Sequence, residues 1–264
     1  MGEGRKPGRP QTRSLRDQIE KQATRRSCLV DLRVHNPAVV GYSGVDGIDP
    51  ARALVSLARI KGIDIMAISD LYSTDFIDRV QLAKGEQPIV IIPGVDLRCR
   101  LGGCDDIVLS CLFPEQNGSA ALSGFLSQLS IPRSAAGNEQ IIVNRPIDTI
   151  IALTEERQGV VLPIRVDKTP HRAQAIPEMV ERWGFRAFDL AYGESARYFS
   201  DRWPKHKFHL FNFSNAYALA QVGTRSVRLK LASPDFAGIR ELIMRRSERT
   251  DEGISSIDEL RKEG

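Results

Sequence analysis

The sequence predicts an α/β fold in which short buried strands alternate with amphipathic helices and close into a barrel. Apolar runs such as Cys28–Val34 and Ile63–Ile68 are typical of buried strands. Between them, Pro50–Lys61 carries apolar residues at helical spacing and ends at Gly62. The same rhythm continues along the chain for about seven units. Short apolar strands in such units favour a barrel over an open sheet, because both faces of each strand must be covered.

The remaining elements follow from the same two patterns. We expect strands at Ile89–Ile92, Ile107–Phe113, Val160–Ile164, Ala187–Ala191, Phe208–Phe213 and Val227–Leu231. Helices are expected at Asp75–Lys84, Ser119–Leu129, Ile147–Glu156, Ile176–Trp183, Glu194–Arg202 and Phe236–Arg246, with a short helical turn at Ala216–Gln221. The alternation predicts a mostly parallel sheet. A doubly wound sheet is the alternative, although no glycine-rich phosphate loop follows any strand.

Charge divides the chain into three parts. The net charge of +4 is concentrated in residues 1–26, where eight Lys and Arg face three acids, so the remaining residues are close to neutral. We predict a basic, largely flexible segment at 1–26 with a short helix over 15–24, a barrel at 27–250 and a polar tail at 251–264. A barrel surface that gripped nucleic acid would be expected to be basic itself.

Two absences in the sequence suggest where the protein is found. No run of eighteen apolar residues occurs, so we expect no transmembrane helix. The N-terminal segment is basic and polar without an apolar stretch behind it, unlike a secretory signal. The expectation is a cytoplasmic protein without membrane contact.

Polar residues follow the first three expected strands in a recognisable order. The first strand ends in Asp31-Leu32-Arg33-Val34-His35, the second in Ala67-Ile68-Ser69-Asp70-Leu71, and the third in Ile92-Pro93-Gly94-Val95-Asp96. These segments resemble the opening of a PHP domain (polymerase and histidinol phosphatase), which reads Asp-Leu-His-x-His, Ala-Ile-Thr-Asp-His and Ile-Pro-Gly-x-Glu. Segments 107–114, 159–167 and 211–223 are similar to later PHP motifs, so the resemblance covers roughly residues 28–245.

The resemblance implies a distorted (β/α)7 TIM-like barrel of the PHP type and a metal-dependent phosphoesterase ancestry. In active relatives the strand ends hold two or three metal ions, which activate water and polarise a phosphate oxygen. This chain keeps few of those ligands. The eight matching positions are occupied by Arg33, His35, Leu71, Asp96, Val108, Arg165, Asn215 and Tyr217.

Only His35 and Asp96 are plausible metal ligands among these eight, with Asn215 a poor third. Catalytic sites usually have three protein ligands and an open position, so the resemblance implies an eroded metal site. Arg33 and Arg165 stand where relatives have ligands, and a guanidinium can supply the positive charge of a metal. We expect them either to neutralise Asp31, Asp70 or Asp96 at the barrel mouth or to point into solvent.

Three functions remain open at this stage. The first is a non-catalytic scaffold or a binder of an anion such as a phosphate-containing small molecule, with no cofactor. The second is a phosphoesterase with a reduced Mn, Zn or Fe site built on His35 and Asp96. The third is a nucleic-acid-associated accessory protein that uses the basic tail. Whichever function applies, we expect Arg33, His35, Asp70, Asp96, Arg165, Asn215 and Tyr217 to converge on one face, where strands of such barrels end.

Overall fold

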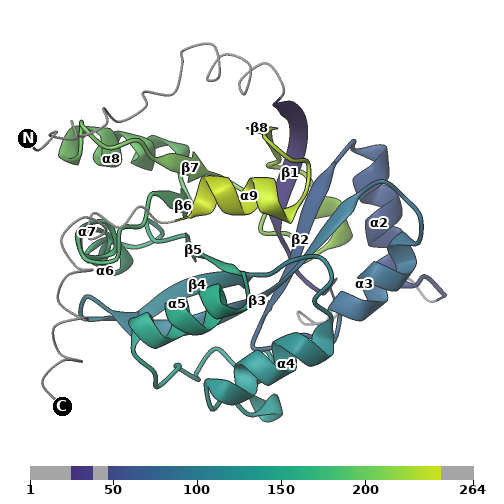
Figure 1. Ribbon diagram of the computed structural model, residues 1–264, viewed down its shortest axis with the longest axis horizontal. Helices are drawn as coiled ribbons and strands as arrows, with labels where there is room; N and C mark the ends of the chain where they lie inside the picture. The colour runs from purple at the N-terminus through teal and green to yellow at the C-terminus, as the bar shows by residue number, and fades with distance from the viewer. Residues whose placement is uncertain (1–24, 38–46, 245–264) are drawn as a thin grey trace, which may run out of the picture.

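Eight strands in the described part of the chain form one sheet that curls into a nearly closed barrel (Figure 1). The structure is a computed structural model and describes residues 25–37 and 47–244. The sheet order is β7-β6-β5-β4-β3-β2-β1-β8. The strands are β1 Arg26–Val34, β2 Ile65–Leu71, β3 Val90–Leu101, β4 Cys104–Leu112, β5 Val160–Ile164, β6 Ala187–Asp189, β7 His209–Phe211 and β8 Val227–Leu231.

The strand directions differ from a purely parallel barrel at two places. β3 and β4 form an antiparallel hairpin through Gly102 and Gly103, and β5 then runs antiparallel to β4. β8 runs antiparallel to the first half of β1. The other four strand pairs are parallel. The expectation of a mostly parallel sheet therefore holds for six strands, whereas β4 and β8 run the opposite way.

The barrel closes at the carboxyl ends of the strands through the segment that follows β7. Ala216 forms a parallel bridge with Val34 at the end of β1. The Ala216 N–H donates to the Arg33 carbonyl at 3.0 Å, and the His35 N–H donates to the Ala216 carbonyl at 2.8 Å. This closure holds the end of β1 and the residues after β7 against one another.

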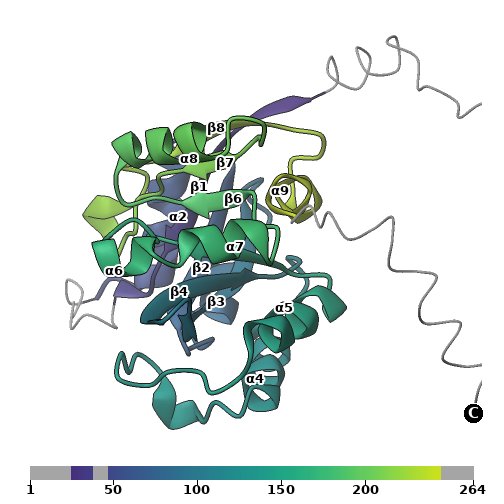
Figure 2. The ribbon, with the colours of Figure 1, turned by 90° about the vertical axis from the view of Figure 1, so that its left-hand side faces the viewer.

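Helices cover the outside of the barrel, as two views at right angles show (Figure 1, Figure 2). They are α2 Pro50–Ile60, α3 Ile77–Lys84, α4 Ser119–Gln128, α5 Ile147–Glu156, α6 Pro170–Ala173, α7 Ile176–Glu181, α8 Ala196–Arg202 and α9 Phe236–Ile243. Short 3-10 turns occur at Arg133–Ala135, Gly193–Ser195 and Leu219–Gln221. Most helices lie close to their expected ranges, while the turn expected from Ala216 forms only from Leu219.

Two apolar clusters make up the core. The larger cluster lies between the outer face of the sheet and the surrounding helices. The smaller one fills the barrel and includes Val30, Ala67, Leu162 and Phe211 from four strands. Phe236 and Ile239 of α9 join this inner cluster, so α9 closes the end of the barrel opposite the strand carboxyl ends. The open end is therefore the mouth formed by those carboxyl ends.

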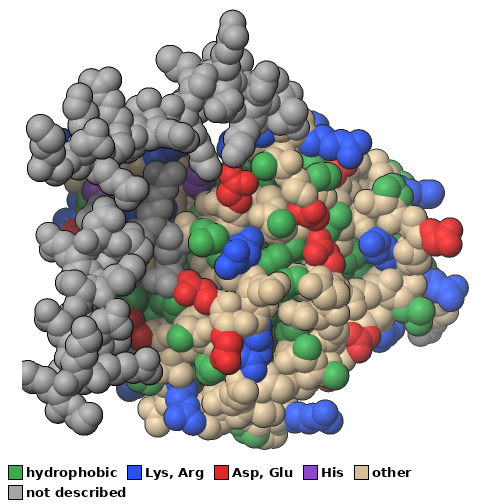
Figure 3. Space-filling model, viewed as in Figure 1, with side chains coloured by type: hydrophobic (Ala, Val, Ile, Leu, Met, Phe, Trp, Pro, Cys, Tyr) green, Lys and Arg blue, Asp and Glu red, His purple; other side chains and the backbone are tan. Residues whose placement is uncertain are grey.

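The surface on the α9 side carries mixed charges. Acidic and basic side chains are interspersed on the face that Figure 3 shows, and neither sign covers it as a continuous field.

No helix in residues 47–244 is long and apolar enough to cross a membrane. The helix expected over 15–24 and the tail expected over 251–264 lie outside the described residues.

Candidate functional site

Residues from seven separate segments meet at the mouth of the barrel and line a cavity of about 430 Å³. Six of the seven site residues expected from the sequence line this cavity: Arg33, Asp70, Asp96, Arg165, Asn215 and Tyr217. The seventh, His35, is 2% exposed and stacks on the Tyr217 ring, with centroids 4.0 Å apart. The structure therefore brings all seven to one place.

A bulge in β1 directs Arg33 into the barrel. The register of β1 against β2 shifts between Asp31 and Val34. Leu32 belongs to the inner cluster, and yet the next side chain, Arg33, also reaches inner carboxylates. A bulge permits this because it breaks the strict alternation of side chains along a strand.

Arg33 is the buried cation at the floor of the cavity. Its Nη1 atom lies 3.4 Å from Oδ2 of Asp189, and its Nη2 atom lies 4.0 Å from Oδ2 of Asp96. Burial raises the pKa of Asp189 to about 6, while the neighbouring Arg33 cation lowers it. Two buried carboxylates thus share one guanidinium. The contact with Asp96 was expected from the sequence, whereas the contact with Asp189 was not.

His35 is held as a neutral ring. Its Nδ1 atom faces the Ser69 carbonyl, and its Nε2 atom lies 3.4 Å from Oδ1 of Asn215. Burial lowers the pKa of His35 to about 4, although the nearby Asp96 raises it. The ring is therefore uncharged at neutral pH, and its two nitrogens are directed to groups of the protein.

Asp70 and Asp31 are buried, and neither has an arginine side-chain partner among the described residues. Asp70 accepts the Asn36 N–H at 2.9 Å, and burial raises its pKa to about 7. Asp31 accepts from the Ser214 hydroxyl and from the Gly223 N–H at 3.1 Å, so it ties β1 to the closing segment. The expectation that an arginine neutralises Asp31 or Asp70 is not met, since hydroxyl and backbone donors serve these carboxylates.

Arg165 reaches the mouth from a strained position directly after β5. Its φ is +49°, in the left-handed region that non-glycine residues rarely occupy. Tyr72 after β2 and Asn215 after β7 are also left-handed, with φ of +54° and +51°. Backbone strain of this kind persists only where the surrounding structure holds the residue in place, and it is common at functional sites. Three strand ends of this mouth share that feature.

The guanidinium of Arg165 is half-buried, and within residues 25–37 and 47–244 it forms no ion pair. Burial lowers its pKa, and the Arg33 cation lowers it further. The expected neutralisation of Asp31, Asp70 or Asp96 by Arg165 is therefore not observed. The left-handed turn carries the side chain along the cavity wall, where it lines the mouth.

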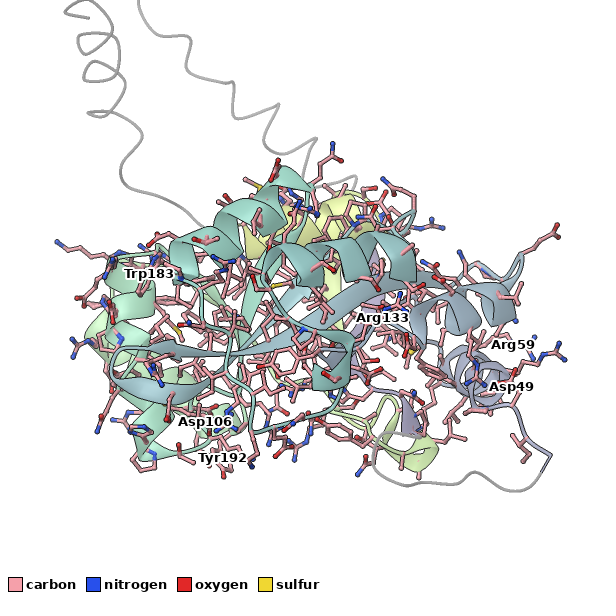
Figure 4. All side chains as sticks on the ribbon, turned by 90° about the horizontal axis from the view of Figure 1, so that it is seen from below. Asp49, Arg59, Asp106, Arg133, Trp183 and Tyr192 are labelled. Atoms are coloured by element: carbon pink, nitrogen blue, oxygen red, sulfur yellow. The ribbon has the colours of Figure 1, made fainter. Side chains whose placement is uncertain are left out.

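A second group of basic residues, which the sequence did not reveal, borders the cavity. Arg172 of α6 contacts Oδ2 of Asp106 through Nε and Nη2, both at 2.8 Å, and Nε of Arg98 lies 3.1 Å from Oδ1. The Arg172 hydrogen bond holds the pKa of Asp106 below its usual range. Lys168 also lines the cavity and is exposed. Figure 4 shows Asp106 on the side of the molecule away from α9.

The cavity wall therefore carries slightly more positive than negative groups. Five cations face four carboxylates, namely Arg33, Arg98, Arg165, Lys168 and Arg172 against Asp70, Asp96, Asp106 and Glu139. Two of the cations, Arg98 and Arg172, share the single carboxylate of Asp106. Arg165 and Lys168 stand free of ion pairs in the described part of the chain. Such a wall attracts an anion to the Arg165 side.

Solved structures with this architecture were found by comparison. A protein from Bifidobacterium adolescentis assigned as a metal-dependent phosphoesterase matches with a TM-score of 0.52 and 15% identity, over 81% of this chain and 94% of that one. A two-domain protein from Bacteroides vulgatus that contains a predicted PHP-like metal-dependent phosphoesterase matches with a TM-score of 0.54 and 10% identity. That match covers 83% of this chain and 63% of the longer protein.

The fold is that of the PHP-like metal-dependent phosphoesterases. An amidohydrolase from Chromobacterium violaceum, solved with bound sulfate and no metal, matches at a TM-score of 0.54 and 11% identity, over 83% of this chain and 98% of that one. No family model and no curated protein sequence matches the chain.

The donors at the mouth of this PHP-type barrel do not fit a metal centre. Within the described ranges, no three His, Cys, Asp or Glu side chains are grouped so that they could hold a metal ion. The nitrogens of His35 are directed to Ser69 and Asn215, and the Arg33 cation lies beside Asp96. A guanidinium this close to a carboxylate opposes a second cation there. The positive charge at the floor of this mouth is that of Arg33.

Proposed function

We propose that this PHP-fold protein binds the phosphate group of a small molecule at the barrel mouth and does so without metal-dependent catalysis. The observation that carries the proposal is Arg165, a half-buried cation without an ion-pair partner among the described residues that lines the cavity. Burial of a cation that forms no ion pair costs free energy, and Arg165 is half-buried, so an anion that reaches it gains a charge-assisted contact.

The surroundings of Arg165 support a phosphate ligand in particular. A guanidinium matches phosphate oxygens in a two-point geometry, and Lys168 adds a flexible positive charge beside it. Tyr217 and Asn215 line the same cavity and offer neutral hydrogen-bonding groups. The amidohydrolase from Chromobacterium violaceum, which shares the fold, was solved with bound sulfate and no metal, so at least one protein of this architecture binds an anion without a metal.

The non-catalytic part of the proposal rests on the donor set. At the eight positions that match PHP metal ligands, His35 and Asp96 are the plausible ligands that remain, and each is already engaged by a neighbour. No resident metal is needed to hold the anion because the arginines supply its counter-charge. A nucleic-acid role through the basic segment stays a prediction, since residues 1–24 lie outside the described part of the chain.

Phosphate binding can be measured by isothermal titration of the full chain with inorganic phosphate in EDTA. We expect measurable binding that weakens at least about tenfold in Arg165→Ala, because a charge-assisted hydrogen bond contributes roughly 1.5–3 kcal/mol. Arg197→Ala is the matched control, since Arg197 lies on α8 outside the cavity and pairs with Asp201. Binding that is absent, or that Arg165→Ala leaves unchanged, would refute the proposal. Binding that requires added metal would favour a reduced phosphoesterase site.

A further inference from the structure

Four neighbouring buried polar atoms, two of them on residues that line the cavity, have no hydrogen-bond partner within the described residues. They are Nε of Arg33, Oδ1 of Asp96, and the hydroxyl oxygens of Ser69 and Ser110. All four side chains are more than nine-tenths buried. Buried polar atoms are almost always hydrogen-bonded, so a group of four in one place calls for an explanation.

The strand register places these atoms together. Asp96 on β3 is directly opposite Ser110 on β4. Ser69 on β2 is opposite Gly94, one inward-facing position earlier on β3 than Asp96. Facing side chains in an antiparallel pair lie within about 5 Å of each other at Cβ. Arg33 joins them, because its guanidinium lies 4.0 Å from Oδ2 of Asp96.

These four atoms require a partner that can both donate and accept hydrogen bonds. Oδ1 of Asp96 needs a hydrogen-bond donor, whereas the Nε–H of Arg33 needs an acceptor. Each serine hydroxyl can take either role. An ammonium group only donates and a phosphate oxygen only accepts, so neither satisfies the whole set. A hydroxyl group satisfies both Asp96 and Arg33.

We propose that the anion held at Arg165 is the phosphate of a hydroxylated ester, a polyol phosphate, whose hydroxyl groups reach the floor formed by Asp96, Ser110, Ser69 and Arg33. This inference rests on the proposed phosphate binding and adds the chemistry of the carbon chain. Asp96 and Arg33 line the same cavity as Arg165, and its volume of about 430 Å³ admits a small phosphate ester.

The test compares two esters that differ only in their hydroxyl groups. Glycerol 3-phosphate and n-propyl phosphate are titrated separately into the full chain by calorimetry in EDTA. We expect glycerol 3-phosphate to bind at least about tenfold more tightly, because a site with unpaired polar groups discriminates against an analogue that lacks the hydroxyl. Ser110→Ala and Asp96→Asn should each reduce this ratio to about threefold or less.

Ser127→Ala is the matched control, since Ser127 lies on α4 and its hydroxyl donates to the Ser123 carbonyl at 2.9 Å. Equal affinities for the two esters in the wild-type chain would overturn the inference while leaving phosphate binding intact, as would a preference that survives in both variants. If neither ester binds, the proposed function fails and this inference fails with it.

Discussion

Nη1 of Arg33 lies 3.4 Å from Oδ2 of Asp189, so a buried ion pair joins β1 to β6, two strands that are not neighbours in the sheet. Asp189 also accepts the Phe213 N–H at 2.9 Å from the segment that closes the barrel. The pair therefore lies between the two sides of the closure, beneath the cavity where the anion is proposed to bind.

Arg33→Met should destabilise the protein strongly. Removal of one partner leaves the Asp189 carboxylate buried without its cation, which costs about 3–5 kcal/mol. Chemical denaturation at pH 8 measures the loss. In the Arg33→Met, Asp189→Asn double variant most of the stability should return, because the asparagine carries no charge and still accepts from Phe213. A double variant that is no more stable than Arg33→Met would contradict this role of the pair.

The pH dependence of stability should carry the signature of Asp189. Burial raises its folded pKa to about 6, above the unfolded value of about 3.9. The folded state therefore binds more protons between about pH 4 and 6, and the stability from this group is full below pH 4 and lost as pH rises through 6. Asp189→Asn should consequently destabilise more at pH 4 than at pH 8, by on the order of 2 kcal/mol.

Urea denaturation of wild type and Asp189→Asn across this pH range gives the comparison. Asp201→Asn serves as the control, since Asp201 is exposed on α8 and should show no such trend. A difference between wild type and Asp189→Asn that stays constant from pH 4 to 8 would show that Asp189 does not titrate in this way.

Backbone strain at Arg165 gives a third prediction. At φ of +49°, replacement by glycine should relieve a cost that alanine retains. Arg165→Gly should therefore be more stable than Arg165→Ala by about 1 kcal/mol, although both remove the guanidinium. The helical position Arg197 is the control, because there the order should reverse and alanine should be the more stable. Thermal melts of the Gly and Ala variants at positions 165 and 197 measure these differences. If Arg165→Ala were more stable than Arg165→Gly, the backbone strain at this position would be contradicted.

Packing inside the barrel can be tested at Gly94. A Cβ atom at this position would lie 2.8 Å from Cδ2 of Leu112 and 3.2 Å from Cβ of Ser69. Gly94→Ala should destabilise by about 1–3 kcal/mol through overpacking, measured by denaturant unfolding. Gly193→Ala should change stability by less than about 0.5 kcal/mol, since nothing lies within 4 Å of its added Cβ. Equal effects at the two glycines would argue against the inward packing of β2, β3 and β4.

Much of the fold was predictable from local pattern. The starts of β1, β2 and β3 lie within about two residues of those expected from the apolar runs, although β3 continues to Leu101, well past its expected end at Ile92, and most helices lie near their expected ranges. Gly102 and Gly103 mark the β3–β4 hairpin, so the reversal at β4 has a local signal in the sequence. The direction of β8 was missed because its partner β1 is distant in sequence.

The site was predictable where it rests on strand ends and not where it rests on distant partners. Asp189 was missed as the partner of Arg33, although a lone carboxylate in the apolar run Ala187–Ala191 signals a buried charge. Asp106 had no comparable signal, since its contact with Arg172 spans 66 residues. For Arg165 the sequence left both an ion pair and a solvent-facing position open, and its left-handed turn, which no sequence pattern specified, leads it along the cavity wall.

In the proposed function, arginines and not metal ions supply the positive charge at this barrel mouth. The most direct measurement is the ratio of Mn, Fe and Zn to protein in the full chain purified without chelator. We predict well under one metal ion per chain, with no change in His35→Ala. One or more metal ions per chain in wild type, reduced in His35→Ala, would contradict the claim.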